Sequence, residues 1–231
     1  SGQYVLGQLG VYGANYRLAV LMTLFIQMFR YAAEPFFFSH AKEENAKTLY
    51  ATVMKYFIIF CLLIFLVVML YLDIFKYFIG PDFRVGLHIV PIILLANLFL
   101  GIFYNLSVWY KLTDKTRFGA LIALAGAVIT VALNILLVPK YGYTGAAWAH
   151  LACYLAMVIL SFMLGRHHYR INYDIRNITI YFALAGGIYL LSNYIHIESK
   201  LLTLGLNALL IGTFLVFAIL LEKKTYLRDF K

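Results

Sequence analysis

Seven apolar stretches, each about as long as a bilayer is thick, run through this chain of 231 residues. At a helical rise of about 1.5 Å per residue, roughly 20 apolar residues cross the hydrocarbon core of a membrane. The stretches lie at 18–38, 56–75, 87–110, 118–138, 144–165, 178–195 and 201–221. They predict an all-α integral membrane protein with about seven transmembrane helices, in a single polytopic domain over residues 1–231. Membrane β-barrels are excluded, because their strands are shorter and alternate polar with apolar residues.

The connections between these stretches give further predictions. Residues 41–55 place apolar side chains at helical spacing in a charged segment, which predicts an amphipathic interfacial helix leading into the second stretch. The second stretch, 56–75, has no charge before Asp73 and is expected to face lipid. Residues 139–143 are a very short connection, so the stretches 118–138 and 144–165 are expected to form a tight antiparallel hairpin.

The basic residues segregate between alternate connections. Most of them lie in the first, third and fifth connections and in the C-terminal tail: Lys42, Lys47, Lys55, Lys111, Lys115, Arg117, Arg166, Arg170, Arg176, Lys223, Lys224, Arg228 and Lys231. The second, fourth and sixth connections hold Lys76, Arg84, Lys140 and Lys200. Arg17 lies at the edge of the first span and Arg30 lies within it. Cytoplasmic loops of membrane proteins carry an excess of Lys and Arg. The distribution therefore predicts a cytoplasmic C-terminus and an N-terminal end outside.

The beginning of the chain bears on its completeness. It opens Ser1-Gly2-Gln3, with no methionine, basic n-region or signal peptide. The charge distribution nevertheless predicts that this end lies outside the membrane. We therefore expect a piece of a longer membrane protein, with at least one helix preceding it.

Composition excludes several classes of function. The chain is 64% hydrophobic and 13% charged, with a formal net charge of +9. Because the basic residues are divided among loops on one side, topology and anionic lipid headgroups explain them, and nucleic acid is not expected as a partner. Cys61 and Cys153 lie inside spans without metal-site spacing. No grouping of residues points to catalysis, so no enzymatic activity, metal or cofactor is predicted.

Charged side chains in the first span are the sharpest candidates for function. Arg30 and Glu34 are four residues apart, a spacing that predicts an ion pair on one helix face. Such a pair either lines a polar cavity that meets an anionic substrate or an ion, or extends to headgroups at the interface that Pro35 marks. Arg17, at the outer mouth of this span, is either a membrane-edge anchor or a cation that attracts substrate.

Three asparagines, Asn97, Asn105 and Asn134, also lie inside spans. Side-chain amides in membrane helices bond to neighbouring helices, in contacts worth about 0.6 kcal/mol on average. Packing between helices is therefore the favoured interpretation, and the lining of a substrate cavity is the alternative. Together with the three charged residues they form the set of substrate-cavity candidates.

Parts of the chain resemble a known family. Residues 10–19, Gly-Val-Tyr-Gly-Ala-Asn-Tyr-Arg-Leu-Ala, and residues 29–35, Phe-Arg-Tyr-Ala-Ala-Glu-Pro, form one block. Residues 134–147 hold the pattern N-x4-P-x2-G-x2-G-A-A. These segments are similar to the second half of bacterial polysaccharide flippases, the exporters of lipid-linked oligosaccharides (O-antigen type) in the MATE-like MOP superfamily. The likeness covers nearly the whole chain.

The resemblance implies helices eight to fourteen of a fourteen-helix protein whose two pseudo-symmetric lobes enclose a central cavity. The chain is then the C-terminal lobe, and without the N-terminal lobe of the same protein no transport is expected. The implied function is flipping of a polyprenyl-diphosphate-linked oligosaccharide across the bacterial cytoplasmic (inner) membrane, by alternating access, for lipopolysaccharide and other cell-envelope polysaccharides. The resemblance also implies that Arg17 and Arg30, with Glu34 beside Arg30, hold the diphosphate.

Three other functions remain open. An ion-coupled drug or metabolite exporter of the same superfamily is favoured by a carboxylate deep in a span, and Glu34 comes closest. A seven-helix receptor is a second alternative, although residues 201–221 lack the lysine that a retinal-binding type needs. A non-transporting membrane scaffold for a glycan synthase is the third.

Overall fold

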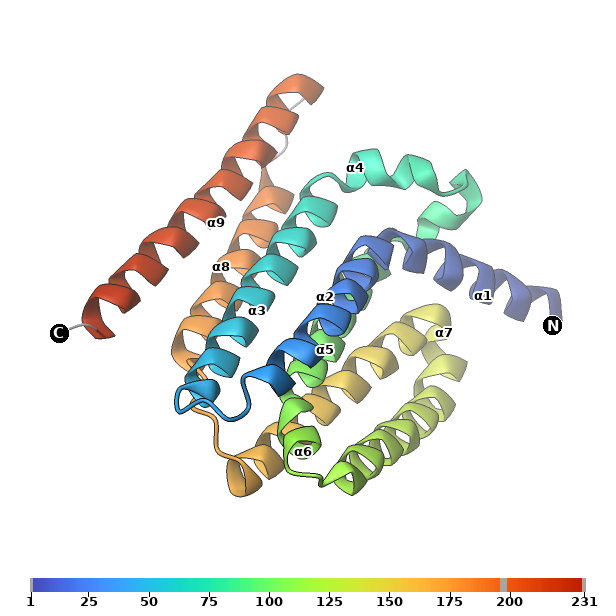
Figure 1. Cartoon of the computed structure of the whole chain (residues 1–231). Coiled ribbons are helices and arrows are strands. Elements are labelled where there is room, and N and C mark those ends of the chain that lie inside the picture. Colours follow the sequence, from blue (N-terminus) through green and yellow to red (C-terminus); the bar gives the residue numbers. More distant parts are fainter. Residues whose placement is uncertain (1, 196–198, 230–231) are drawn as a thin grey trace.

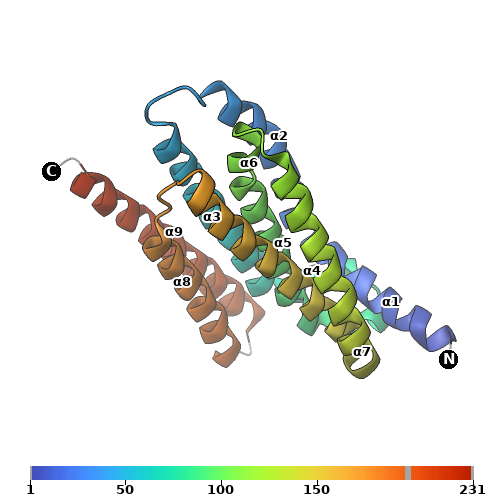
Figure 2. The ribbon, with the colours of Figure 1, turned by 90° about the horizontal axis from the view of Figure 1, so that it is seen from below.

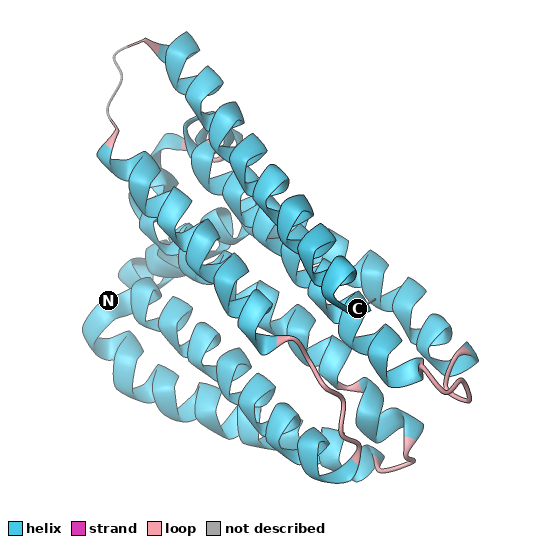
Figure 3. Ribbon diagram, turned by 90° about the vertical axis from the view of Figure 1, so that its left-hand side faces the viewer, coloured by secondary structure: helices cyan, strands magenta, loops and turns pink. Residues whose placement is uncertain are grey.

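The structure is a computed structural model that describes residues 2–195 and 199–229. Within these ranges the chain is helical almost throughout and contains no strand, as Figure 3 shows. The longer helices are α1 (Gly2–Tyr16), α2 (Val20–Ser39), α3 (Ala46–Leu70), α5 (Val90–Leu106), α7 (Thr116–His168), α8 (Ile175–Tyr194) and α9 (Lys200–Asp229). Shorter elements connect them: η1 (Arg17–Ala19), α4 (Leu72–Phe75), η2 (Lys76–Phe78), η3 (Pro81–Ile89) and α6 (Val108–Leu112).

In the described part of the chain, six helices are long and apolar enough to cross a membrane. They are Leu6–Ser39, Ala46–Leu70, Pro81–Leu112, Thr116–His168, Ile175–Tyr194 and Leu201–Lys224. These helices confirm the prediction of a multi-pass, all-helical membrane protein. The helix Thr116–His168 contains two of the seven predicted spans. The first span begins earlier than predicted, because α1 and η1 continue the helix upstream of residue 18.

The two arms of α7 form the predicted antiparallel hairpin. Gly142 has φ 56° and ψ −135°, a conformation that bends the helix back on itself and that glycine adopts at least cost. The arms approach closely, since Cys153 Sγ donates a hydrogen bond to the carbonyl oxygen of Gly126 at 3.3 Å. Figures 1 and 2 show the arms side by side and joined at the bend.

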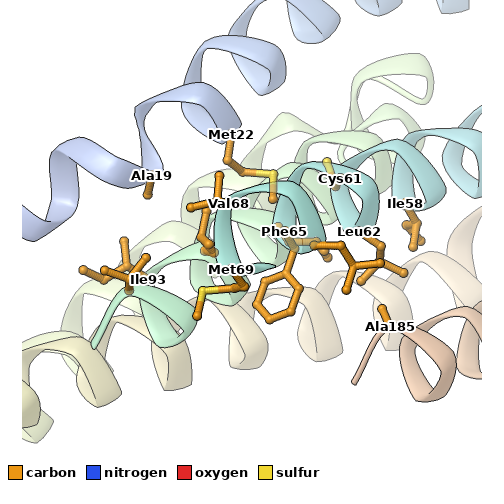
Figure 4. Close-up of a cluster of buried hydrophobic side chains, with 14 of the residues drawn as sticks. Ala19, Met22, Ile58, Cys61, Leu62, Phe65, Val68, Met69, Ile93 and Ala185 are labelled. Atoms are coloured by element: carbon orange, nitrogen blue, oxygen red, sulfur yellow. The ribbon is translucent and has the colours of Figure 1, made fainter. Parts of the chain in front are cut away.

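Helix α3 lies in the middle of the bundle, so the expectation that residues 56–75 face lipid is wrong. The side chains of Phe57, Ile58 and Leu62 are at most 2% exposed. α3 packs against α2 and α5 and also against α8 and α9. Figure 4 shows Met22 of α2 and Ala185 of α8 in the same core. A continuous apolar sequence suits lipid neighbours and helix neighbours equally, which is why composition alone does not distinguish them.

The predicted interfacial helix at 41–55 is also wrong as a separate element. Residues 40–45 form turns, and α3 begins at Ala46 and continues unbroken past residue 55 to Leu70. The apolar positions do share one face, because Ala46, Tyr50 and Met54 are all buried. Lys55, at the end of the segment, is also buried and pairs with Glu222 of α9.

Polar contacts fix the α8–α9 pair against α3 at two levels. At one level Lys55 Nζ lies 2.6 Å from the Glu222 carboxylate of α9, and the hydroxyl of Tyr181 in α8 donates to the same carboxylate at 2.6 Å. The side chains of Lys55 and Glu222 are only 11% and 15% exposed. At the other level Asn207 Nδ2 donates to the carbonyl oxygen of Leu70 at 2.6 Å. Hydrogen bonds and charge therefore set the position of the pair along α3.

Replacing Gly142 with alanine should destabilise the protein. A Cβ at this position lies 2.4 Å from Gln8 Oε1, and the positive φ disfavours any side chain, so we expect a loss of about 1–3 kcal/mol. The thermal unfolding midpoint of the purified protein in detergent measures the effect. Gly187→Ala in α8 is the matched control, because a Cβ there has nothing within 4 Å. Equal midpoints for the two variants would contradict the strain assigned to the bend.

Removing one member of the buried Lys55–Glu222 pair should cost about 3–5 kcal/mol, because the other charge stays buried without a partner. We expect Lys55→Met and Glu222→Leu each to lower the free energy of unfolding, and the double variant to recover most of the loss. A double-mutant cycle measured by denaturant unfolding tests this. The exposed Lys76–Asp73 pair is the control, for which the same cycle should give less than about 1 kcal/mol. Additive single losses at Lys55 and Glu222 would refute the coupling.

Candidate functional site

Seven polar side chains follow one face of the first transmembrane helix, and we name them the polar track. They are Gln8, Tyr12, Tyr16, Thr23, Gln27, Arg30 and Glu34. Successive members are three, four or seven residues apart, the spacing that keeps side chains on one face of a helix. All seven are half-buried, between a core-facing side that includes Met22 and Ile26 and an exposed side that includes Leu24 and Met28.

One end of the polar track borders a groove between α1 and the hairpin of α7. The groove has a volume of about 960 Å³, and both arms of the hairpin contribute to its lining. Gln8 Oε1 accepts a hydrogen bond from the backbone N–H of Tyr143 at 3.2 Å. The Tyr12 hydroxyl lies 3.0 Å from His150 Nδ1. These two contacts hold α1 beside the bend, as Figure 1 shows.

Residues in the middle of the polar track form hydrogen bonds with α5. The Tyr16 hydroxyl donates to Asn97 Oδ1 at 3.4 Å, and Asn97 Nδ2 donates to Thr23 Oγ1 at 3.4 Å. The ring of Tyr16 is also stacked on His150, with ring centroids 6.3 Å apart. Buried Asn97 therefore joins two members of the track across the short η1 turn that separates α1 from α2.

The other end of the polar track carries its charges. Glu34 Oε1 lies 2.6 Å from Lys111 Nζ of α6, and the guanidinium carbon of Arg30 lies 4.8 Å from the ring centroid of Tyr104 in α5. These residues and Asn105 line a small cavity of about 20 Å³. A cavity of this size has room for about one water molecule.

The predicted ion pair between Arg30 and Glu34 does not form. Glu34 is paired with Lys111 instead, and Arg30 makes a cation–π contact with Tyr104. The four-residue spacing permits a pair within α2, but α6 and α5 bring better partners to the two side chains from outside the helix. Lys111, which the sequence indicated only as part of the basic cytoplasmic set, is thus a partner of the site.

The structure separates the other candidates. Asn97 lies in the middle of the polar track, and Asn105 lines the small cavity at its charged end while donating to the Gly101 carbonyl oxygen at 3.1 Å. Asn134 lines the groove and donates to the Thr130 carbonyl oxygen at 2.8 Å. Arg17 is exposed in η1, outside the face that the track follows.

Sequence reasoning missed the neutral members of the polar track and His150. A signal for them was present, because Gln8, Tyr12, Tyr16, Thr23 and Gln27 repeat at the same helical spacing as Arg30 and Glu34. His150 gave no such signal, since it is isolated on its own helix and joins Tyr12 only through the fold.

The polar track carries groups that can bind a polar ligand. The track offers hydroxyls, amides, aromatic rings, one guanidinium and one carboxylate, and the described residues contain no group of three or more His, Cys, Asp or Glu side chains that could hold a metal. Such a lining suits the polar part of an amphiphilic molecule next to the apolar surface of the same helix.

Comparison of the chain with protein-family models, with curated proteins and with solved structures gave no match. The fold and the site together define a multi-pass helical membrane protein with the polar track along one transmembrane helix.

A cysteine placed on the polar track should be reached from water, and one on the adjacent apolar side should not. In a background of Cys61→Ala and Cys153→Ala, we expect Gln27→Cys to react with a charged methanethiosulfonate reagent at least about tenfold faster than Met28→Cys, because a thiol in hydrocarbon stays protonated and the reagent is excluded. The measurement is the labelling rate in membrane vesicles. Similar rates at the two neighbouring positions would show that the track does not border a polar space.

Proposed function

We propose that the protein is one lobe of an alternating-access flippase that moves a polyprenyl-diphosphate-linked oligosaccharide across the bacterial cytoplasmic membrane. One observation carries the proposal: the polar track extends along a transmembrane helix from an open groove to the Glu34–Lys111 ion pair. A lipid-linked glycan is amphiphilic, so its carrier needs a polar path beside an apolar surface.

The exposure of the track residues supports a polar path. An arginine at the centre of a membrane helix costs about 2.5–3.5 kcal/mol when it is inserted into lipid. Thr23, Gln27 and Arg30 are nevertheless only partly buried, so we infer that they border a polar space. On the neighbouring side Leu24 and Met28 are 51% and 69% exposed, which suits the hydrocarbon chains of lipids.

The distribution of charge along the track suits a substrate with one anionic end. From Gln8 to Gln27 the track is neutral, and its charges are confined to Arg30 and Glu34. The charge of Glu34 is paired with Lys111, whereas the guanidinium of Arg30 lies over an aromatic ring and keeps its N–H groups available for an anion. Guanidinium groups bind phosphate oxygens in pairs, so we assign the diphosphate to Arg30 and the glycan to the neutral part of the track.

Alternating access requires a second wall opposite the track. We infer that the N-terminal lobe implied by the family resemblance supplies it, and that rocking of one lobe against the other opens the path to each side in turn. Arg17, exposed at η1, is then a cation at the edge of this path. Membrane lipids and the lipid-linked glycan are the proposed partners.

The positive-inside rule predicts how the proposed flippase is oriented in the membrane. From the connections rich in Lys and Arg, which include Lys111, we infer that the charged end of the polar track and the C-terminus lie in the cytoplasm. The α7 bend, the groove and the N-terminal end then face outward. A glycan bound along the track would thus leave toward the groove.

An ion-coupled drug or metabolite exporter is the second candidate, and one observation favours it. Glu34 is the one carboxylate on the polar track, and its pairing with Lys111 could be exchanged for a bound cation or a proton. The two candidates differ in what a neutral residue at position 34 does. In the exporter Glu34→Gln abolishes ion-dependent transport, and in the flippase glycan export persists.

Arg30→Gln should reduce glycan export at least about tenfold, because the anionic end of the substrate loses its cation. Arg30→Lys should retain part of the activity, since lysine binds phosphate only as a point charge. Export is measured as surface polysaccharide, with the accumulation of lipid-linked precursor as a second reading. The cells carry the complete reading frame of the protein in place of the native copy.

Arg176→Gln is the matched control, because it removes the same charge from the start of α8, outside the polar track. Sided labelling of Lys140→Cys and Lys115→Cys in the same cells reports the orientation. Normal surface polysaccharide in cells without the gene would overturn the function. Normal export by Arg30→Gln would overturn only the role of Arg30.

A further inference from the structure

The groove beside the α7 bend has unused hydrogen-bonding groups on facing walls. Asn134 uses its Nδ2 on the carbonyl oxygen of Thr130, and Gln8 uses its Oε1 on the N–H of Tyr143. Asn134 Oδ1 and Gln8 Nε2 are then left without a partner among the described residues. One wall thus offers an acceptor and the other a donor to a molecule in the groove.

Aromatic rings supply the remaining surface of the groove. Tyr12, Tyr141, Tyr143, Tyr154 and His150 contribute to its lining. The flat C–H faces of sugar rings pack against aromatic rings, while their hydroxyls bond to amides and phenols. A volume of about 960 Å³ lies at the upper end of the range for sites that hold small molecules and admits several sugar rings.

The charged side chain that lines the groove is positive. Lys140 is exposed and lines the groove, and the described lining contains no aspartate or glutamate. Among these lining residues only His150 could add a further charge, and it is engaged with Tyr12. A positively charged ligand therefore meets repulsion without any compensating carboxylate, whereas a neutral or acidic one does not.

We propose that this groove is a glycan-binding subsite that accepts neutral and acidic sugars and rejects cationic amino sugars, with Lys140 as the residue that sets this selectivity. The inference rests on the proposed function, because it describes the sugar portion of the same substrate. It assigns roles to individual residues of the groove: hydrogen bonding by Asn134, Gln8 and the Tyr154 hydroxyl, and charge selection by Lys140.

Binding of three soluble tetrasaccharides to the purified protein, produced from its complete reading frame, tests the proposal. The probes are maltotetraose, tetragalacturonate and the glucosamine tetramer, which are neutral, acidic and cationic. Titration calorimetry or saturation-transfer NMR is run in a detergent without a sugar headgroup. We expect the neutral and acidic probes to bind, and the cationic probe to bind at least about tenfold more weakly.

Two pairs of variants locate the site. Lys140→Glu should weaken the acidic probe at least about tenfold and leave the neutral probe within about twofold, while Lys115→Glu, the same change at the other end of the first α7 arm, should do neither. Tyr154→Phe should weaken all bound probes about threefold or more, and Tyr31→Phe, an exposed tyrosine of α2, should have no effect. Retained binding of the neutral probe shows that the Lys140→Glu and Lys115→Glu variants are folded, and an unchanged thermal unfolding midpoint shows it for Tyr154→Phe.

Equal binding of all three probes, binding of none, or equal effects of Lys140→Glu and Lys115→Glu would each overturn the subsite. These outcomes are separable from failure of the proposed function. If glycan export requires the protein but the groove binds no soluble glycan, the subsite alone is refuted. If the cells export glycan without the protein, the proposed function is refuted whatever the groove binds.

Discussion

Polar groups inside a membrane bundle are costly to leave without a partner, and this cost governs how the helices of the described chain are joined. An unsatisfied polar group in hydrocarbon costs several kcal/mol. Asn97 therefore bonds to both Tyr16 and Thr23, and Lys55 meets Glu222. Each contact links helices that are distant in sequence, so the few polar residues fix relative positions that an apolar surface alone would leave free to slide.

The features that were predicted correctly from the sequence each depend on a single segment of the chain. Apolar length identified the spans, and the short connection at 139–143 identified the α7 hairpin. The predictions that were wrong concern contacts with residues from elsewhere in the chain. Whether α3 touches lipid or other helices is decided by which helices surround it, and apolar composition is the same in both cases. Likewise the spacing of Arg30 and Glu34 could not reveal Lys111, which lies 77 residues from Glu34.

The candidate site was predictable to an intermediate degree, for the same reason. Arg30, Glu34, Asn97 and Asn134 stood out because polar residues are rare in these spans. The repeat that joins Arg30 and Glu34 to Tyr12 and Tyr16 could be found within a single helix. Their assignment to two ends and a middle required the fold. The division of one helix into a half-buried polar side and an exposed apolar side is what makes it suitable for an amphiphilic substrate.

The bend at Gly142 joins the two arms of α7 without a flexible loop between them. Helical structure continues to the bend on both sides, and the arms are packed together at Gly126 and Cys153. Two of the walls of the groove therefore behave as one rigid piece and cannot open or close against each other. Any change in the width of the groove falls to α1, which is held to the hairpin by the side chains of Gln8 and Tyr12 and continues into α2 through a single 3-10 turn.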